Sequence, residues 1–140
     1  MSAKRDEGIM SPRAPDPVGP YPHARRAGHL LFLSGIGPRT RGSAEIPGVT
    51  RDAGGRIVSH DIAAQCRAAF QNVRAVLEDA GSSWDRIVDV TVYLTDDALP
   101  IYNRVYAEQF TGIRPARTTV QVSRLPTDIA IELKVIATID

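Results

Sequence analysis

Apolar residues on one helical face between residues 62 and 77 constrain the fold most. They recur at spacings of three and four, and they are Ile62, Cys66, Ala69, Phe70, Val73, Val76 and Leu77. Ser59 or His60 lies just before this segment and Gly81 just after it, where N-terminal and C-terminal stops are favoured. A helix with a single apolar stripe must bury it, so the pattern predicts a helix packed on a second layer.

Segments with the two-residue period or the short apolar run of a strand supply that layer. In chain order they are residues 29–35, 56–58, 86–95, 118–123 and 129–139. Residues 86–95 alternate strictly, and Val88, Val90, Val92 and Leu94 lie on one side of this strand. Only residues 124–128 separate the last two strands, which predicts a hairpin-like connection. The order indicates an α+β fold, a mixed sheet with two helices on one face.

The remaining segments define one domain preceded by an arm. Residues 1–16 combine prolines with scattered charges, a composition that buries too little apolar area to offset its ordering entropy, so we expect a flexible N-terminal arm. Residues 17–140 are then expected to form a single domain. Within it, residues 38–55 predict a long loop or irregular hairpin. A second helix is expected from near Pro100, in whose first turn proline costs no hydrogen bond, to about Phe110.

Charge and cysteine content exclude several classes of function. Seventeen basic and sixteen acidic residues leave a formal net charge of +1, which gives no overall field to gather nucleic acid or an anionic membrane. The only cysteine, Cys66, excludes a disulfide framework. The first residues are charged without an apolar run behind them, so we expect no secretory leader and a cytoplasmic location. His23, His29 and His60 lack the spacing of a zinc site, and no metal or cofactor is expected.

Glu132 lies on a face of mixed character in the last strand. Alternation puts Ile131 and Leu133 on one side, so Glu132, Lys134 and Ile136 share the other. A solvated face is the ordinary explanation for a glutamate and a lysine in a strand. Ile136 would then lie in water beside two charges, and a face that is both apolar and charged often contacts another subunit. Periodicity alone leaves both interpretations open.

Arg117 stands at the beginning of the preceding strand, with Thr119 on the same side. A guanidinium in that place offers a rigid pair of donors suited to a carboxylate. A surface salt bridge is an equally ordinary role for such an arginine. Tyr21 and Asn103, taken singly, are more often structural than catalytic. The residues alone therefore do not decide between a binding site and a solvated surface.

Short motifs follow one another in a fixed order between about residue 17 and residue 138. They are Gly19-Pro20-Tyr21, residues 31–35, Gln65-Cys66-Arg67 with Asn72-Val73, residues 90–95, Tyr102-Asn103, residues 114–120, Leu125-Pro126 and Ile131-Glu132-Leu133. Together they resemble the YjgF-like reactive intermediate deaminase (Rid) family. The resemblance implies a chorismate-mutase-like α+β fold and a homotrimer with active sites between subunits. A subunit contact of this kind would account for the mixed face of the last strand.

The resemblance also implies roles for individual residues. Arg117 matches the family's carboxylate-binding arginine, Glu132 its water-activating glutamate, and Asn103 a polar residue of the catalytic cleft. The substrate-binding positions fall on Tyr21, Ser34, Gly35 and Thr119. Thr119 stands where many members carry cysteine. The segment 95–100 is shorter than usual before Asn103, which makes this last assignment the least secure.

Residues 20–28, 45–49 and 77–84 look most like the 2-aminomuconate deaminases within the family. This implies hydrolysis of 2-aminomuconate, an enamine dicarboxylate, to 4-oxalocrotonate and ammonia in aromatic amine catabolism. The alternatives are a generalist that hydrolyses short 2-imino acids, and a non-catalytic member that binds a small carboxylate or has a ribonuclease or chaperone-like role. The presence of both Arg117 and Glu132 favours an enzyme, and the near-zero net charge disfavours RNA.

A dicarboxylate substrate needs a cation for its second carboxylate. The candidates near the pocket motifs are His23, Arg25, Arg39 and Arg124, and His23 is included among the expected substrate-binding residues. Surface charge explains an exposed arginine pair such as Arg25 and Arg26 equally well. The sequence does not choose among these cations.

Overall fold

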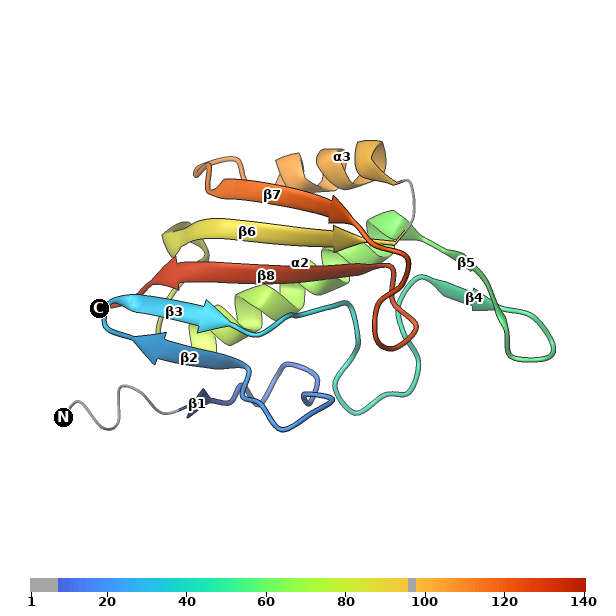
Figure 1. Cartoon of the computed structure of the whole chain (residues 1–140), viewed down its shortest axis with the longest axis horizontal. Helices are drawn as coiled ribbons and strands as arrows, with labels where there is room; N and C mark the ends of the chain where they lie inside the picture. Colours follow the sequence, from blue (N-terminus) through green and yellow to red (C-terminus); the bar gives the residue numbers. More distant parts are fainter. Residues whose placement is uncertain (1–7, 96–97) are drawn as a thin grey trace.

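A six-stranded mixed sheet forms the main layer of the computed structural model, which describes residues 8–95 and 98–140 (Figure 1). The strand order is β1-β2-β3-β8-β6-β7. The strands of this sheet are β1 (Gly8–Ile9), β2 (Ala24–Ala27), β3 (Leu30–Leu33), β6 (Ile87–Leu94), β7 (Ala116–Gln121) and β8 (Ile131–Thr138). Neighbouring strands pair antiparallel except β6 and β7, which are parallel.

Two helices lie on one face of the sheet, as predicted. The helix α2 (Ile62–Asp79) crosses behind the sheet in Figure 1, and α3 (Leu99–Gln109) lies beside β7. The predicted apolar stripe of α2 is buried against the sheet. Asp61, rather than Ser59 or His60, is the N-cap, and its carboxylate accepts the backbone N–H of Ala64 at 3.1 Å. The predicted C-terminal stop is confirmed at Gly81, whose φ of 90° suits a residue without a side chain.

The connection between β7 and β8 is not the predicted hairpin. β7 pairs only with β6, and β8 pairs with β6 on its other side and with β3. The helix α3 joins β6 to β7, and a strand–helix–strand connection places its two strands parallel. β8 occupies the other side of β6, and not the free side of β7 that a hairpin would use. β7 is left as the edge strand of the sheet.

The expectation for Val88 is also corrected. The register of β6 against β8 shifts between Ile87 and Asp89, so one extra residue is inserted in β6. Ile87 is buried, whereas the Val88 side chain is 42% exposed. A bulge of one residue turns the side chains on either side of it relative to the partner strand. The strict alternation predicted for this strand therefore begins only at Val90.

Residues 8–16 are packed rather than loose, which corrects the expected arm over that range; residues 1–7 lie outside the described residues. The Ser11 hydroxyl donates to the Asp79 carboxylate at 2.6 Å, and the Arg13 guanidinium forms an ion pair with the same carboxylate at 2.8 Å. Ala14 is buried. These contacts with the end of α2 are mainly polar, so the low apolar content of the segment did not reveal them.

The long segment before α2 is the predicted irregular hairpin. Its strands, β4 (Val49–Arg51) and β5 (Ile57–His60), pair antiparallel in a small second sheet with a shifted register. No helix within the part of the chain that the structure describes has the length and apolar character needed to span a membrane.

A candidate active site in two halves

The two residues expected to do the chemistry lie on opposite faces of the sheet. Arg117 of β7 is in register with Val90 of β6, and Val90 is buried on the helix-covered face. Glu132 of β8 is in register with Tyr93, on the face that no described helix covers. Residues in register on neighbouring strands share a face. Arg117 and Glu132 of one chain are therefore separated by the sheet, and the strand β6 lies between their strands.

Glu132 lies in a cavity of about 310 Å³ on the open side of the sheet. The residues around it include Tyr21, Gly35, Gly37, Arg39, Pro126 and Glu132 itself. We call this cavity the Glu132 pocket. Tyr21, Gly35 and Glu132 were each expected at the site, and the structure brings them together. The volume suits a small organic acid, because ligand pockets usually begin at about 300 Å³.

The Glu132 carboxylate is half-buried and has no hydrogen-bond donor among the residues that the structure describes. Burial raises the pKa of this carboxyl group above its ordinary value, and the nearby positive charge of Arg39 partly opposes that rise. Lys134, two residues further along the same strand, donates instead to the Leu33 carbonyl at 2.6 Å. The carboxylate is therefore a base without a structural partner, of the kind that can take a proton from water.

Gly35 allows the backbone to approach the carboxylate. A Cβ added at this position would lie 2.8 Å from both Cδ and Oε2 of Glu132, closer than real contacts allow. The backbone of Gly35 is not in the left-handed region, so the need for glycine is a matter of space and not of strain. Gly35, which was expected to line the pocket, thus also determines where the Glu132 carboxylate can lie.

Arg117 is held in place by several groups on the helix-covered side. Its Nε donates to the Thr119 hydroxyl at 2.8 Å, and Nη2 donates to the Asn103 side-chain oxygen at 2.7 Å. Its Cζ lies 4.7 Å from the ring centroid of Tyr106 and 5.1 Å from that of Tyr102. We call these five residues the Arg117 cluster. Thr119 thus serves as an acceptor for the arginine.

Aromatic packing fixes the position of α3 and therefore of the Arg117 cluster. Phe70 of α2 contacts Tyr102 and Tyr106 at centroid distances of 6.1 and 6.2 Å, and Trp84 stacks on Phe110 at 4.8 Å. Burial raises the pKa of the Tyr102 and Tyr106 hydroxyls, and the charge of Arg117 opposes this in both. The two rings remain neutral and present their faces to the guanidinium.

Asn103 was the least secure of the expected site residues, and the structure places it directly on Arg117. The shortened segment before it includes residues 96 and 97, which lie outside the described residues. Asn103 is on the exposed side of α3 and does not reach the Glu132 pocket of its own chain. Its contact with Nη2 orients the guanidinium, which indicates a positioning role.

Ser34 and His23 are engaged with the main chain. The Ser34 hydroxyl donates to the Pro22 carbonyl at 2.7 Å. His23 is buried, its Nδ1 accepts the Ser11 N–H at 2.8 Å, and its Nε2 donates to the Pro15 carbonyl at 2.7 Å. Both ring nitrogens are used, so this histidine fastens residues 11–15 to the sheet and has no nitrogen left for a substrate.

Two amide side chains of α2 hold the walls of the site, although the sequence suggested no role for them. The buried Gln65 donates to the Pro47 carbonyl at 3.0 Å and accepts the Ala130 N–H at 2.8 Å, just before Glu132 in the chain. Asn72 donates to the carbonyls of Gly37 and Arg39 at 2.9 and 2.8 Å. An amide within the apolar stripe of a helix is the signal that could have identified Gln65.

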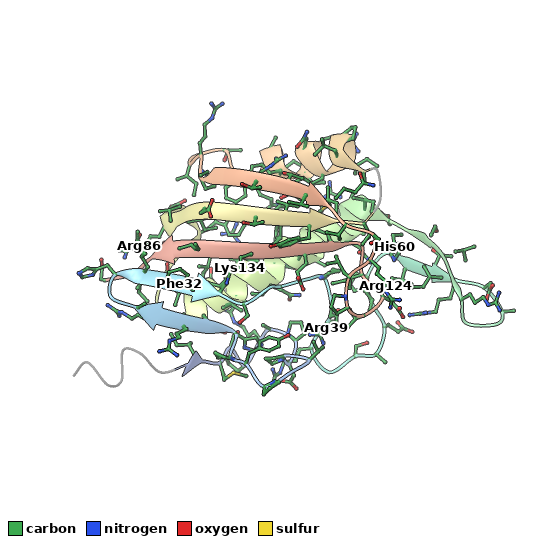
Figure 2. All side chains as sticks on the ribbon, viewed as in Figure 1. Phe32, Arg39, His60, Arg86, Arg124 and Lys134 are labelled. Atoms are coloured by element: carbon green, nitrogen blue, oxygen red, sulfur yellow. The ribbon has the colours of Figure 1, made fainter. Side chains whose placement is uncertain are left out.

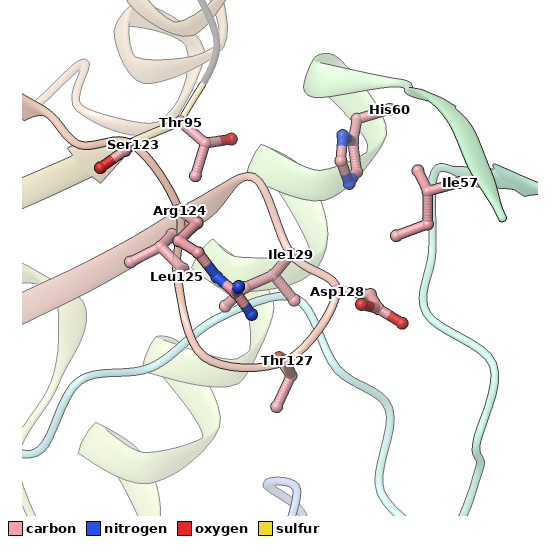
Figure 3. A pocket seen from close by; sticks show the side chains of 9 residues that line it. All are labelled: Ile57, His60, Thr95, Ser123, Arg124, Leu125, Thr127, Asp128 and Ile129. Atoms are coloured by element: carbon pink, nitrogen blue, oxygen red, sulfur yellow. The ribbon is translucent and has the colours of Figure 1, made fainter.

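A second cavity, of about 280 Å³, lies beyond the loop that connects β7 to β8 (Figure 3). His60, Thr95, Ser123, Arg124 and Asp128 line it, and Thr127 and Ile129 border both cavities. Arg124 points into this cavity and does not line the Glu132 pocket. Among residues 8–95 and 98–140, no group of three or more histidine, cysteine, aspartate and glutamate side chains is arranged to hold a metal ion.

Comparisons with known proteins agree with this architecture. Residues 11–139 match the family described as endoribonuclease L-PSP. A RutC family protein of Pyrococcus horikoshii is 42% identical over 135 residues, covering 94% of this chain and 96% of that protein. A 2-iminobutanoate/2-iminopropanoate deaminase of Dermatophagoides farinae is 34% identical over 142 residues and is covered completely, as is this chain.

A solved structure agrees over nearly the same range. The crystal structure of the YjgF gene product of E. coli has a TM-score of 0.81 and 33% identity, covering 94% of this chain and 98% of that one. The family expected from the motifs is thus confirmed, and so is its fold. With most of its length matched by the family and by relatives above 30% identity, the chain belongs to the YjgF-like Rid family, also described as RutC or endoribonuclease L-PSP proteins.

Proposed function

We propose that the protein is a cofactor-independent hydrolase that converts 2-aminomuconate to 4-oxalocrotonate and ammonia. The observation that carries this proposal is the Glu132 carboxylate, which is half-buried, lacks a hydrogen-bond donor among the described residues and faces a cavity of about 310 Å³. A carboxylate whose pKa is raised by burial is a stronger base than one in water. The family resemblance supplies the type of reaction, and the pocket supplies the base.

The chemistry requires positioning more than chemical activation. Tautomerisation converts the enamine to an imine, whose C2 carbon is electrophilic. Glu132 takes one proton from a water molecule while the water oxygen attacks C2 of the protonated imine, which gives a neutral carbinolamine. The protonated Glu132 delivers that proton to the amine nitrogen. The C–N bond then breaks and ammonia leaves, while Glu132 takes the hydroxyl proton as the 2-oxo group forms and passes it to the released ammonia. General acid–base assistance of this type contributes about 10²- to 10⁴-fold.

Arg117 is proposed to bind the carboxylate next to C2. Thr119 and Asn103 orient its guanidinium, which leaves part of the donor fork available for a carboxylate. Because Arg117 and Glu132 of one chain lie on opposite faces of the sheet, they can act on one molecule only if they come from different chains. Each site would then combine the Glu132 pocket of one protomer with the Arg117 cluster of another, as in the proposed homotrimer.

The surface of the open face supports self-association. Phe32 and Ile136 are only partly covered on this face, and Val88 and Val120 are 42% and 40% exposed. Figure 2 shows Phe32 and Lys134 on neighbouring strands of the face turned toward the viewer. The edge strand β7, which carries Arg117, pairs on one side only. Contact between this edge and the open face of a second copy would cover apolar side chains and bring the two halves together.

A mixing experiment tests the shared site. Arg117→Ala and Glu132→Gln are each expected to be nearly inactive, and the two proteins are unfolded together at equal amounts and refolded. If each site takes its arginine and its glutamate from different chains, about one quarter of the sites regain both groups, and so does about one quarter of the wild-type ammonia release. If no activity is regained although both variants co-assemble, both groups act from one chain or neither acts, and the shared site is refuted.

The leading alternative is a generalist that acts on short 2-imino acids. It is supported by the Dermatophagoides farinae relative, which is named as a 2-iminobutanoate/2-iminopropanoate deaminase. Ammonia release from freshly generated 2-aminomuconate and 2-iminopropionate is to be measured with the wild type and with Glu132→Gln. We expect a higher kcat/KM for 2-aminomuconate, and loss of both activities in the variant. Equal or greater activity on the shorter compound would favour the generalist.

A further inference from the structure

We propose that Arg39 is the second carboxylate anchor of the Glu132 pocket, so that the pocket selects dicarboxylates over monocarboxylates of the same length. The inference rests on the proposed function, because it names the group that would distinguish 2-aminomuconate from a short 2-imino acid. It begins from the one cation that lines the cavity together with Glu132 among the described residues.

The other cations near the site are poorly placed to bind a second carboxylate of a ligand in the Glu132 pocket. Both ring nitrogens of His23 contact main-chain groups. Arg25 projects from β2, is exposed and does not line the pocket. Arg124 lines the second cavity (Figure 3) and not the Glu132 pocket. The Lys134 ammonium donates to the Leu33 carbonyl. Of the charged groups that could meet a second carboxylate, Arg39 remains.

Hydrogen bonds from α2 and to the N-terminal segment fix the position of Arg39. Asn72 of α2 donates to its carbonyl oxygen at 2.8 Å and to that of Gly37 at 2.9 Å, which fixes the main chain. One guanidinium nitrogen, Nη2, donates to the Asp16 carbonyl at 2.8 Å. No described carboxylate forms an ion pair with Arg39, so its remaining N–H groups are available to a ligand. In the view of Figure 2, Arg39 lies below the strands of the sheet, between the N-terminal segment and the β7–β8 loop.

Charge balance favours a dianionic ligand at this place. The Glu132 carboxylate is negative when it acts as a base, and a substrate with two carboxylates adds two further negative charges. Arg117 from a second chain would neutralise the carboxylate beside C2, and Arg39 would neutralise the other. Arg39 is close enough to Glu132 to lower the pKa of that carboxyl group. A short 2-imino acid has one carboxylate only and would leave the guanidinium of Arg39 without an anionic partner.

Two six-carbon dienes provide the matched probes for a binding test. trans,trans-Muconate has a carboxylate at both ends, and sorbate has a carboxylate at one end and a methyl group at the other; neither carries the amino group. Their dissociation constants are measured by titration calorimetry with the full-length wild type, Arg39→Gln and Arg41→Gln. Arg41 is a suitable control, because it lies in the same loop and contacts Ala14 and Asp16 of the same segment without lining the pocket.

The ratio of the two dissociation constants is the decisive quantity. We expect the wild type to bind muconate more tightly than sorbate, and Arg39→Gln to weaken muconate binding on the order of 10- to 100-fold, with a much smaller effect on sorbate. Arg41→Gln should leave the ratio unchanged. If Arg39→Gln leaves the ratio unchanged, or if the wild type binds sorbate as tightly as muconate, the proposal is overturned.

The outcome is separate from that of the proposed function. Binding of these probes requires no turnover, so it can be measured even if ammonia release from 2-aminomuconate fails. A wild type that deaminates 2-aminomuconate normally but shows no preference for muconate, or a preference unchanged in Arg39→Gln, would reject the Arg39 anchor alone. A muconate preference that depends on Arg39, in a protein that releases no ammonia from either substrate, would support the second anchor and reject the reaction. Circular dichroism of both variants shows that the comparison is made between folded proteins.

Discussion

The charged groups of the Glu132 pocket and the Arg117 cluster differ in their hydrogen-bond partners. The carboxylate has no hydrogen-bond donor among the described residues, and burial raises its pKa. The guanidinium donates to Thr119 and Asn103 and lies over two aromatic rings. A group that takes a proton needs a lone pair that is free to accept it, whereas a group that only binds an anion benefits from a fixed orientation. The difference is the one expected between an acid–base residue and a substrate anchor.

The largest expected effect comes from changing the carboxylate itself. Glu132→Gln keeps the shape of the side chain and removes the base, so turnover should fall about 10²- to 10⁴-fold. The melting temperature should not fall, because the variant removes a half-buried charge that has no described partner. Ammonia release and thermal unfolding are to be compared with those of Glu108→Gln, which affects only an exposed ion pair with Arg67. A Glu132→Gln enzyme as active as this control would show that Glu132 is not the base.

A smaller but more specific effect is expected when the carboxylate is displaced without being removed. In Gly35→Ala the new methyl group would meet the end of the Glu132 side chain, which can move away. Turnover should fall about 10- to 100-fold, since misplacement by about 1 Å can cost that much. Gly112→Ala is the matched control, because nothing lies within 4 Å of a Cβ there. Both variants should unfold near the wild-type temperature, and unchanged turnover in Gly35→Ala would contradict the close packing proposed for catalysis.

Loosening the Arg117 cluster should affect binding rather than chemistry. Asn103→Ala removes the acceptor of Nη2 on an exposed helix face, where alanine is a good helix former. KM should rise about 3- to 10-fold with little change in kcat, because the hydrogen bond is partly exposed. Arg104→Ala, the neighbouring exposed residue of α3, is the control and should change neither parameter. A fall in kcat at constant KM would instead assign Asn103 a direct part in the chemistry.

The smallest effect is a shift of the pH profile. Glu132 must be ionised to act as a base, so activity is lost as the pH falls through its pKa. The charge of Arg39 lowers that pKa, and its removal in Arg39→Gln should raise it further. The acidic limb of kcat/KM for a short 2-imino acid should therefore move to higher pH in Arg39→Gln, by comparison with Arg41→Gln on the same substrate. Lys134 and Arg25, which lie on the same face, are present in both proteins. A shift to lower pH, or none, would show that Arg39 does not act electrostatically on the base.

The strands and helices could largely be predicted, whereas their arrangement could not. The stripe of α2 and the alternation of β8 follow from local periodicity, which depends on a few neighbouring residues. The bulge at Val88 and the separation of β7 from β8 depend on pairing between distant segments. Residues 8–16 were expected to be loose because their composition is poor in apolar groups, yet they pack through Ser11, Arg13 and His23. Such polar contacts have no period in the sequence.

In the candidate site too, the sequence predicted some features and long-range contacts decided the others. Motif resemblance predicted Arg117, Glu132 and Gly35 as site residues, and the structure places Gly35 and Glu132 around one cavity and Arg117 on the other face of the sheet. It did not indicate that Gln65 and Asn72 hold the walls of the pocket, or which cation accompanies Glu132. His23 was a reasonable candidate by position, and its ring nitrogens are used for the main chain instead. Proximity in the chain therefore identified the neighbourhood of the pocket and not the direction of each side chain.

By itself, the sequence determined both helices, the longer strands and the family, because each of these depends on local pattern or on ordered motifs; the short strands β1, β2 and β4 were not predicted. Only the tertiary structure decided that Arg117 and Glu132 lie on opposite faces of one sheet and that Arg39 lines the pocket of the carboxylate. The physical reason is strand pairing. The face on which a side chain emerges depends on the register and the neighbours of its strand, and long-range contacts set both.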